Sequence, residues 1–258
     1  MVLLLAGAAW GAELPAAEPR ERLIEQHLPY GLPSTGELLF RRGYVAGHNN
    51  WLKIPNWVAY HLPAAKIKGD TERAKAFVAD PELKPFQRAE PEDYKGSGYD
   101  RGHMAPAADM KTDPEEMEES FLLSNVTPQV GKGFNRGVWK KLEDRVRRWS
   151  QERDAVWVVT GPVFVPEGDM MKFQLIGKRR VAVPTHFFKI VYSRGAEARP
   201  AVIAFILPNA PSSAKELADH ITTVDLIEER TGLDFFSALE DGAEESLESR
   251  KAESLESW

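Results

Sequence analysis

Three stretches of the chain carry the dense apolar and β-branched pattern that is typical of buried strands. They are residues 155–161 (AVWVVTG), 181–192 (VAVPTHFFKIVY) and 201–207 (AVIAFIL), each bounded by Gly, Pro or Asn. Two shorter aromatic runs, residues 43–49 (GYVAGHN) and 56–62 (NWVAYHL), are separated by asparagine and proline, which predicts a hairpin-like pair of strands. The pattern therefore predicts a β-sheet.

Helical spacing of apolar positions occupies other segments. The pattern predicts helices over residues 135–148, 213–220 and 224–231, and the last two follow the start signals Pro211 and Thr223. Strands and helices occur in blocks and not in strict alternation. The sequence therefore predicts an α+β fold in which helices flank a central, mainly antiparallel sheet.

Composition divides the chain into four parts. Residues 1–12 form an apolar run that is too short to span a bilayer and resembles a secretory leader, although no Lys or Arg precedes it. Residues 13–36 are polar and rich in proline and are interpreted as a linker with one short helix, residues 37–239 as the compact domain, and residues 240–258 as an acidic tail, marginally helical or disordered. The leader predicts a secreted or periplasmic protein. A frayed apolar N-terminus is the alternative, and it leaves a cytoplasmic location open.

The distribution of charge changes the meaning of the net charge of −6. The tail holds seven acids and two basic residues, so the rest of the chain is nearly neutral. Residues 131–148 hold seven basic residues and two acids, a confined patch that suits phosphate contact, although a solvated helix face has the same composition. One hypothesis is that the tail acids compete with nucleic acid for this patch.

The absence of cysteine limits the kinds of metal site that the chain can form. Disulfides and thiolate metal sites are excluded, and any metal must be bound by oxygen or by histidine nitrogen. This donor set favours a hard cation such as magnesium.

Residues 100–103 place four side chains of distinct chemistry next to one another: Asp100, Arg101, Gly102 and His103. A lone histidine is more often structural than catalytic. Its neighbours change that balance, because Arg101 is a fixed cation, Gly102 allows close backbone approach to a ligand, and Asp100 can orient the imidazole or brace the loop. The run is therefore a candidate catalytic segment.

A second group follows at helical spacing: Asn135, Trp139, Glu143 and Arg147, each four residues from the next. On an α-helix this spacing predicts a single stripe along one face. Asn135 and Glu143 supply oxygen ligands for a hydrated metal, and Arg147 supplies a fork for phosphate oxygens. The alternative is an amphipathic surface helix with an ordinary Glu143–Arg147 ion pair.

Other polar and aromatic residues receive a structural interpretation. The acidic stretch 113–119 is expected to be a solvated helix start. Histidines in apparent strands are expected to pack or to lie on the surface: His48, His61 and His186. Most tryptophans considered are expected in the core: Trp51, Trp57, Trp139 and Trp157.

Three ordered motifs carry a family resemblance. DRGHMAPAADM (100–110), FLLSNVTPQ (121–129) and N-x-x-x-W-x-x-L-E (135–143) resemble the DNA/RNA non-specific endonucleases, which are ββα-metal or His-Me finger nucleases and include endonuclease G. The similarity covers roughly residues 33–240. It implies a ββα-metal motif at the active site within the α+β fold.

The resemblance also implies roles for individual residues. His103 matches the general base, Asn135 the direct magnesium ligand, and Glu143 the outer-shell acceptor of a metal-bound water. Magnesium is normally held by few protein groups and keeps several waters, which agrees with so sparse a site. Manganese is expected to substitute for it.

Basic residues complete the implied site. Arg101 matches the arginine that approaches the phosphate, Arg73 the transition-state arginine of endonuclease G relatives, and Arg147 a further basic position near the site. Asp100 is expected to support a neighbouring group without touching the substrate. Because bidentate arginine contacts read phosphates and not bases, the site is expected to ignore base identity.

The predicted function is a sugar-non-specific endonuclease that cuts DNA and RNA with one hydrated Mg²⁺ and leaves 5′-phosphate and 3′-OH ends. The competing class is a catalytically weak nucleic-acid-binding or partner-binding protein on the same scaffold, and a third is a phosphodiesterase for a small substrate. The expected partners are DNA and RNA through the phosphate backbone. A homodimer and an inhibitor protein are further partners to be tested, and no membrane span is expected.

Overall fold

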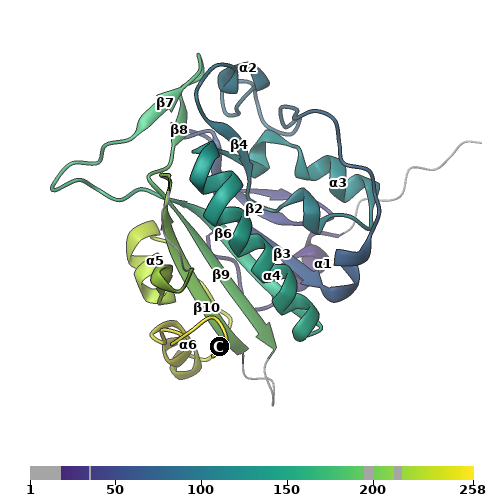
Figure 1. Ribbon diagram of the computed structural model, residues 1–258, viewed down its shortest axis with the longest axis vertical. Coiled ribbons are helices and arrows are strands. Elements are labelled where there is room, and N and C mark those ends of the chain that lie inside the picture. Colours follow the sequence, from purple (N-terminus) through teal and green to yellow (C-terminus); the bar gives the residue numbers. More distant parts are fainter. Residues whose placement is uncertain (1–18, 35, 195–199, 212–216) are drawn as a thin grey trace, which may run out of the picture.

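The computed structural model describes residues 19–34, 36–194, 200–211 and 217–258. Within them, a seven-stranded sheet has the order β1-β2-β3-β6-β9-β10-β11, and all its neighbouring strands are antiparallel (Figure 1). Its strands are β1 Glu37–Phe40, β2 Val45–Asn49, β3 Ile54–Pro63, β6 Ala155–Val163, β9 His186–Arg194, β10 Pro200–Pro208 and β11 Ile221–Thr222. The predicted α+β fold with a mainly antiparallel sheet is confirmed.

Helices cover both faces of this sheet because successive strand residues point to opposite sides. In β3, Val58 and Tyr60 belong to the apolar cluster that contains residues of helix α4. Trp57 and Ala59 belong to a second apolar cluster, which contains residues of helices α1, α5 and α6. The bounds of these helices are α1 Arg20–His27, α4 Lys140–Glu152, α5 Val224–Thr231 and α6 Asp241–Glu248. Figure 1 shows α4 crossing the sheet.

A second, two-stranded sheet lies on the α4 side. Strand β4 (Asp100–His103) pairs antiparallel with β5 (Val126–Gln129), and His103 lies opposite Val126. The chain then continues through the irregular segment η4 (Gly131–Trp139) into α4. The two strands and the helix form the ββα arrangement that the family resemblance implied.

The helix predicted over residues 135–148 is interrupted. Gly137 has φ −125° and ψ −111°, which is not a helical conformation, and regular α-helix begins only at Lys140. Asn135 therefore does not share one continuous helix with Glu143, and the predicted single stripe of four residues is wrong. Trp139 is fully buried in the core and so leaves the stripe altogether.

The strand predicted over residues 181–192 is two strands. Strand β8 (Val181–Val183) pairs with β7 (Gln174–Ile176) in a separate hairpin, and β9 begins at His186. Pro184 stands between them, and proline cannot donate a hydrogen bond to a sheet ladder. The strand predictions for residues 43–49, 56–62, 155–161 and 201–207 are confirmed by β2, β3, β6 and β10.

The helix predicted over residues 224–231 is confirmed as α5, and the Thr223 hydroxyl caps it by accepting a hydrogen bond from the Leu226 amide at 3.2 Å. The helix predicted over 213–220 lies partly outside the described residues, and its described end is a 3₁₀ turn. The remaining short helical segments are η1 Ala64–Lys68, α2 Pro91–Tyr94, η2 Ala107–Asp109, α3 Pro114–Ser120, η3 Leu123–Asn125 and η6 Leu217–His220. Helix α3 confirms the helix start predicted from the acidic stretch.

Residues 19–34, which the sequence assigned to a linker, pack against the sheet. Leu23 is 4% exposed and His27 is fully buried, and the ring of His27 accepts a hydrogen bond from the backbone amide of His61. The sequence did not predict this packing because most residues of the helix are charged or polar and only one narrow face is apolar. The leader-like residues 1–12 lie outside the described part of the chain.

The acidic tail is also part of the packed structure. After α6, Ala252 and Trp258 join the cluster on the α4 side, where the Trp258 ring lies 5.0 Å from that of Trp149. Glu256 forms an ion pair with Arg145 of α4, so one tail acid does engage the basic patch. Composition alone describes this segment as acidic, but its few apolar side chains pack the tail against the rest of the protein.

The structural interpretation of the histidines is confirmed: His48 bonds the Gln87 carbonyl, His61 stacks on Trp157 at 4.4 Å, and His186 bonds Thr185. Trp57 and Trp157 are buried as predicted, but Trp51 is 89% exposed, so its core prediction is wrong. Across the described residues, each helix falls short of the length and apolar character that a bilayer span requires.

Candidate active site

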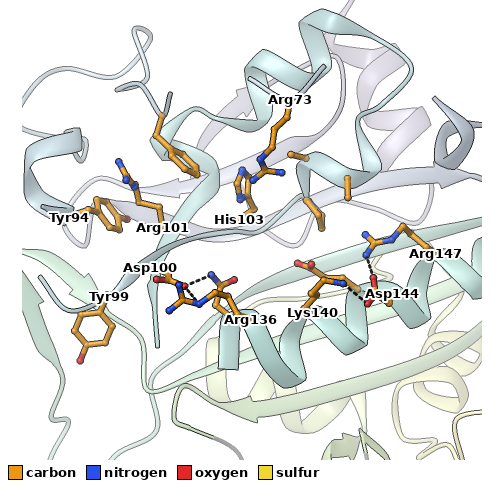
Figure 2. A pocket seen from close by; sticks show the side chains of 16 residues that line it. Arg73, Tyr94, Tyr99, Asp100, Arg101, His103, Arg136, Lys140, Asp144 and Arg147 are labelled. Carbon is orange, nitrogen blue, oxygen red and sulfur yellow. Dashed lines mark hydrogen bonds and ion pairs between the residues drawn. The ribbon is translucent and has the colours of Figure 1, made fainter. Parts of the chain in front are cut away.

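The residues of the two sequence clusters meet in one open cleft of about 660 Å³. Strand β4 and the segment before it form one wall, and η4 with α4 forms the other (Figure 2). The predicted site residues Arg73, Asp100, Arg101, His103, Asn135, Glu143 and Arg147 all line this cleft. The structure thus brings together residues that are far apart in the sequence.

His103 is held between two aromatic rings at the base of the cleft. Its ring centroid lies 4.9 Å from that of Phe77 and 5.0 Å from that of Phe121. Its Nε2 atom is buried and has no hydrogen-bond partner among the described residues. Burial lowers the pKa of His103 to about 3, and the nearby cation Arg73 adds to this shift. The imidazole is therefore neutral at neutral pH and can accept a proton.

The same two phenylalanines support the arginines. The guanidinium carbon of Arg101 lies 5.0 Å from the Phe77 ring centroid, and that of Arg73 lies 4.9 Å from the Phe121 ring centroid. Both arginine side chains are exposed, and the described residues form no ion pair with either one. Two cations therefore flank the neutral imidazole with their charges uncompensated, which suits an anionic ligand.

Asn135 is oriented by Asp100. The amide nitrogen Nδ2 of Asn135 donates a hydrogen bond to Oδ2 of Asp100 at 2.9 Å, and Arg136 Nε lies 3.4 Å from the same oxygen. Because the amide donates to Asp100 through its nitrogen, the carbonyl oxygen of Asn135 is directed elsewhere. The supporting role predicted for Asp100 thus has a specific geometry, which is directed at Asn135 and not at the imidazole.

Glu143 lies further along the same wall, and its carboxylate makes no hydrogen bond with the described residues. Burial raises the pKa of Glu143 to about 7, while the cations Lys189 and Arg147 oppose the shift and the carboxylate of Asp109 adds to it. Lys189 is fully buried on β9, with its Nζ atom 4.5 Å from the Trp139 ring centroid. A buried cation thus lies behind the predicted metal-site carboxylate.

Arg147 is bound by carboxylates of its own. Its guanidinium donates to Asp109 at 2.8 Å and to Asp144 at 2.5 Å, and it forms no ion pair with Glu143. The ordinary Glu143–Arg147 pair of the alternative interpretation is therefore absent from the described structure. Asp109 is fully buried and also accepts from the Tyr60 hydroxyl at 3.1 Å. Arg147 is thus less available to a phosphate than Arg73 or Arg101.

The cleft fits a hard cation better than a soft one. Two observations support this: the Asn135 carbonyl oxygen is free of Asp100, and the Glu143 carboxylate has no hydrogen-bond donor among the described residues. Amide and carboxylate oxygens are ligands that suit magnesium. A separate group of carboxylates that could hold a metal, Asp225, Glu228 and Glu248, belongs to α5 and α6 and does not line this cleft.

Several residues of the site escaped sequence reasoning. Phe121 begins the motif FLLSNVTPQ and Phe77 lies four residues after Arg73, but neither carried a chemical signal. Lys189 did carry one, since a lysine within the apolar run of 181–192 is unusual for a buried strand. Gly102 was expected to admit a ligand, but a Cβ atom there would overlap the Gln129 side chain, so its close neighbour is strand β5.

Comparisons with known proteins agree with this geometry. Residues 25–242 match the family model described as DNA/RNA non-specific endonuclease. A nuclease of Syncephalastrum racemosum is 39% identical over 79% of this chain and 68% of its own length. The mitochondrial endonuclease G of Homo sapiens is 36% identical over 80% of this chain and 71% of its own length.

A solved structure is also similar. Its TM-score is 0.81 at 34% identity, and the match covers 87% of this chain and 94% of that one. It is described as the EndoG/EndoGI complex and the mechanism of EndoG inhibition. Several sequence relatives are named mitochondrial nucleases, so the secreted or periplasmic location expected from the leader finds no counterpart in those names and stays a prediction.

Proposed function

This chain belongs to the DNA/RNA non-specific endonuclease family, and from that membership we propose that it hydrolyses both DNA and RNA with His103 as general base and one hydrated Mg²⁺ as cofactor. The observation that carries the proposal is the convergence of His103 and Asn135 on the same cleft. A protein that only binds nucleic acid needs cations and has no use for a neutral imidazole with an unpartnered nitrogen.

The imidazole of His103 is suited to take a proton from an attacking water. Its depressed pKa keeps it in the neutral form that accepts protons, and the described residues form no hydrogen bond with either ring nitrogen. A phosphate bound by Arg73 would offset the cation that helps to lower this pKa, so the base becomes stronger when substrate arrives. General-base catalysis of this kind contributes about 10²- to 10⁴-fold to a rate.

The exposed guanidiniums of Arg73 and Arg101 would hold the non-bridging oxygens of the scissile phosphate. Such contacts carry no base information, which supports cleavage without sequence preference. Cleavage of both sugars follows if no side chain distinguishes the 2′-OH. Arg147, which is already paired with Asp109 and Asp144, would contribute its charge to the cleft and would contact phosphate only by exchanging a partner.

Asn135 and Glu143 would hold the magnesium ion, Asn135 directly and Glu143 through a water. When bound, the ion supplies a Lewis acid that offsets negative charge on the phosphate and on the leaving oxygen. The protein's own contribution is to keep the Asn135 carbonyl oxygen free, which Asp100 does by binding the amide nitrogen. Manganese shares the preference for oxygen ligands and is expected to substitute.

The proposal is tested by incubating the purified chain with plasmid DNA and with RNA, each in Mg²⁺ and in EDTA. Both polymers should be cut in Mg²⁺ and neither in EDTA. Religation of the DNA fragments reports 5′-phosphate and 3′-OH ends. Cleavage of only one polymer would contradict sugar tolerance, and cleavage in EDTA would contradict the role of the metal.

His103→Ala separates a base from a ligand. The substitution should lower kcat by about 10²- to 10⁴-fold and leave the Mg²⁺ concentration at half-maximal activity unchanged, because a base touches water and not the ion. His186→Ala is the control, since His186 bonds Thr185 and does not line the cleft. A parallel change in kcat and in the metal titration of His103→Ala would instead make His103 a ligand.

Two proposals concern partners. The similarity to a solved EndoG/EndoGI complex leads us to expect an inhibitor protein that covers the cleft, and an inhibitor that carries carboxylates would suit Arg73 and Arg101. A homodimer is the second expectation. Sedimentation of the purified chain measures its mass in solution and so tests the dimer. Competition between DNA and an inhibitor protein for binding tests whether the inhibitor covers the cleft.

A further inference from the structure

We propose that the hairpin of β7 and β8 is a second contact surface for the substrate, which binds the phosphate backbone of a nucleic acid where it leaves the catalytic cleft. We call residues 172–183 the basic hairpin. The inference rests on the proposed function, since it assumes that a polymeric nucleic acid occupies the cleft, and it adds a surface outside the residues that line it.

The basic hairpin is attached to one end of the cleft. Figure 2 shows Tyr94 and Tyr99 at the end opposite Arg147 and Asp144. The hydroxyl of Tyr99 donates a hydrogen bond to Oε1 of Gln174 in β7 at 2.8 Å. In Figure 1, β7 and β8 stand beside α2 and β4 and project from the body. A nucleic acid strand that runs along the cleft past Tyr99 would therefore reach the basic hairpin next.

The attachment is rigid at its base. The backbone amide of Arg179 donates to Oδ1 of Asp93 at 3.1 Å, and Asp93 precedes the cleft-lining Tyr94. Gly177 has φ +67°, and a Cβ atom there would overlap Asp93, so the turn lies directly against α2. Ile176 and Val181 are buried in the same apolar cluster as Tyr94. The hairpin is thus fixed relative to the cleft and needs no ordering when substrate binds.

The charge of the hairpin favours a polyanion. Residues 172–180 (KFQLIGKRR) contain four basic residues and no acid, although the whole chain has a net charge of −6. Arg179 is paired with Asp93 at 3.7 Å and with Glu90 at 4.0 Å. Lys178 and Arg180 are exposed, and neither has an ion-pair partner in the described part of the chain. Two uncompensated cations at one turn match the regular phosphates of a nucleic acid backbone.

The occupant to which we commit is the nucleic acid already held in the cleft. A protein partner would use the apolar side chains of the preceding segment, Met170 and Met171, which are 58% and 50% exposed. Contact with a backbone adds affinity for long substrates, makes binding depend on salt and carries no base preference. If the hairpin instead contacted a protein, removing its cations would change neither the affinity for nucleic acid nor the salt dependence of that affinity. Binding measurements with nucleic acid therefore separate the two occupants.

The test compares the full-length double variant Lys178→Ala/Arg180→Ala with the control Arg250→Ala/Lys251→Ala, which removes the same charge from an exposed pair after α6. Binding of a long DNA duplex is measured in EDTA over a range of salt. The slope of the logarithm of the binding constant against the logarithm of the salt concentration should be smaller in magnitude by about two in the hairpin variant, since each phosphate contact contributes about 0.9. The control should keep the parent slope.

Activity provides the second readout. The hairpin variant should lose about tenfold in kcat/KM on long DNA and nothing on bis(p-nitrophenyl) phosphate, which is too small to reach the hairpin. Lys178→Gln/Arg180→Gln repeats the test with side chains that preserve more of the surface. A hairpin variant that equals the control in slope and in kcat/KM overturns this proposal alone. A parent protein that cuts neither DNA nor RNA overturns the proposed function instead.

Discussion

At the scale of single residues, the chemistry of the cleft depends on which atoms are already engaged. Asp100 accepts a hydrogen bond from Asn135 and forms an ion pair with Arg136, and its bond to Asn135 determines which end of the amide is free. His103 and the two exposed arginines, by contrast, keep their functional atoms unpartnered. Asp100 is thus a positioning residue, and its effect should appear in metal affinity before it appears in rate.

Asp100→Asn tests this assignment. The substituted amide loses the charge that strengthens the bond to Asn135, which costs about 1 kcal/mol, so the Mg²⁺ concentration at half-maximal activity should rise about fivefold. The kcat at saturating Mg²⁺ should stay within about twofold of the parent. The measurement is a magnesium titration of DNA cleavage.

The matched variant for this titration is Asp144→Asn. Asp144 also lines the cleft and bonds Lys140 and Arg147, but it does not contact Asn135. It therefore removes the same charge without releasing the amide. If the two variants shift the titration equally, Asp100 acts only through its charge and the positioning role is wrong.

The site residues could be predicted from sequence because His103, Asn135 and Glu143 stand in motifs that resemble those of a nuclease family, and their side chains are a base and two oxygen ligands. The structure brings all three to one cleft, although their roles remain proposals. Lys189 could not be placed, because its position behind Glu143 depends on β9 lying next to β6 in the sheet. Nothing local in the sequence specifies that strand order.

At the scale of elements, prediction succeeded where a segment carries its own periodicity. Strands β6 and β10 are long, apolar and buried, and both were predicted. The periodicity did not predict strands β4 and β5, which only the family resemblance implied, because each has four residues and forms by pairing with the other. The break at Gly137 was missed because a spacing of four residues describes a helix without testing the backbone between the positions.

The segment after α6 supplies a prediction at this scale. Trp258 is 9% exposed, packs on Trp149 and lies with its ring centroid 4.0 Å from the guanidinium carbon of Arg153. Trp258→Ala should therefore lower the free energy of unfolding by about 3 kcal/mol, which for a chain of this size lowers Tm by roughly 6 °C. Thermal denaturation followed by circular dichroism measures the change.

Trp51→Ala is the matched control, because the same side chain is removed from a position that is 89% exposed. It should change the unfolding free energy by less than about 0.5 kcal/mol. The hypothesis that tail acids compete for the basic patch makes a different prediction, namely tighter DNA binding by Trp258→Ala. Tighter binding with an unchanged Tm would show that the tail regulates the patch and does not stabilise the fold.

At the scale of the whole molecule, the N-terminal helix couples folding to pH. The ring of His27 is fully buried between two backbone groups: Nδ1 accepts from the His61 amide at 3.0 Å, and Nε2 lies 3.1 Å from the Arg42 carbonyl oxygen. Only a neutral imidazole with its proton on Nε2 satisfies both. Burial, aided by the cation Lys66, accordingly lowers the pKa of His27 from 6.5 to about 3.

The consequence for stability follows from proton uptake. Above pH 6.5 the imidazole is neutral in the folded and unfolded chains, and His27 contributes no pH dependence. Between pH 6.5 and about 3 the unfolded chain binds a proton that the folded chain excludes, so stability falls as pH decreases, by about 1.4 kcal/mol per pH unit for this group. Below about pH 3 both states are protonated and the contribution levels off.

His27→Gln removes the titrating group and keeps one donor and one acceptor. Urea unfolding is measured at intervals from pH 8 to pH 4. Below pH 6.5 the unfolding free energy should fall less steeply with decreasing pH in the variant than in the parent, by the slope that corresponds to uptake of about one proton. Because His61 and His103 also have lowered pKa values, part of the acid loss remains in both proteins. Equal slopes below pH 6.5 would mean that His27 becomes protonated within the fold, and the first helix would then separate from the sheet before the core unfolds.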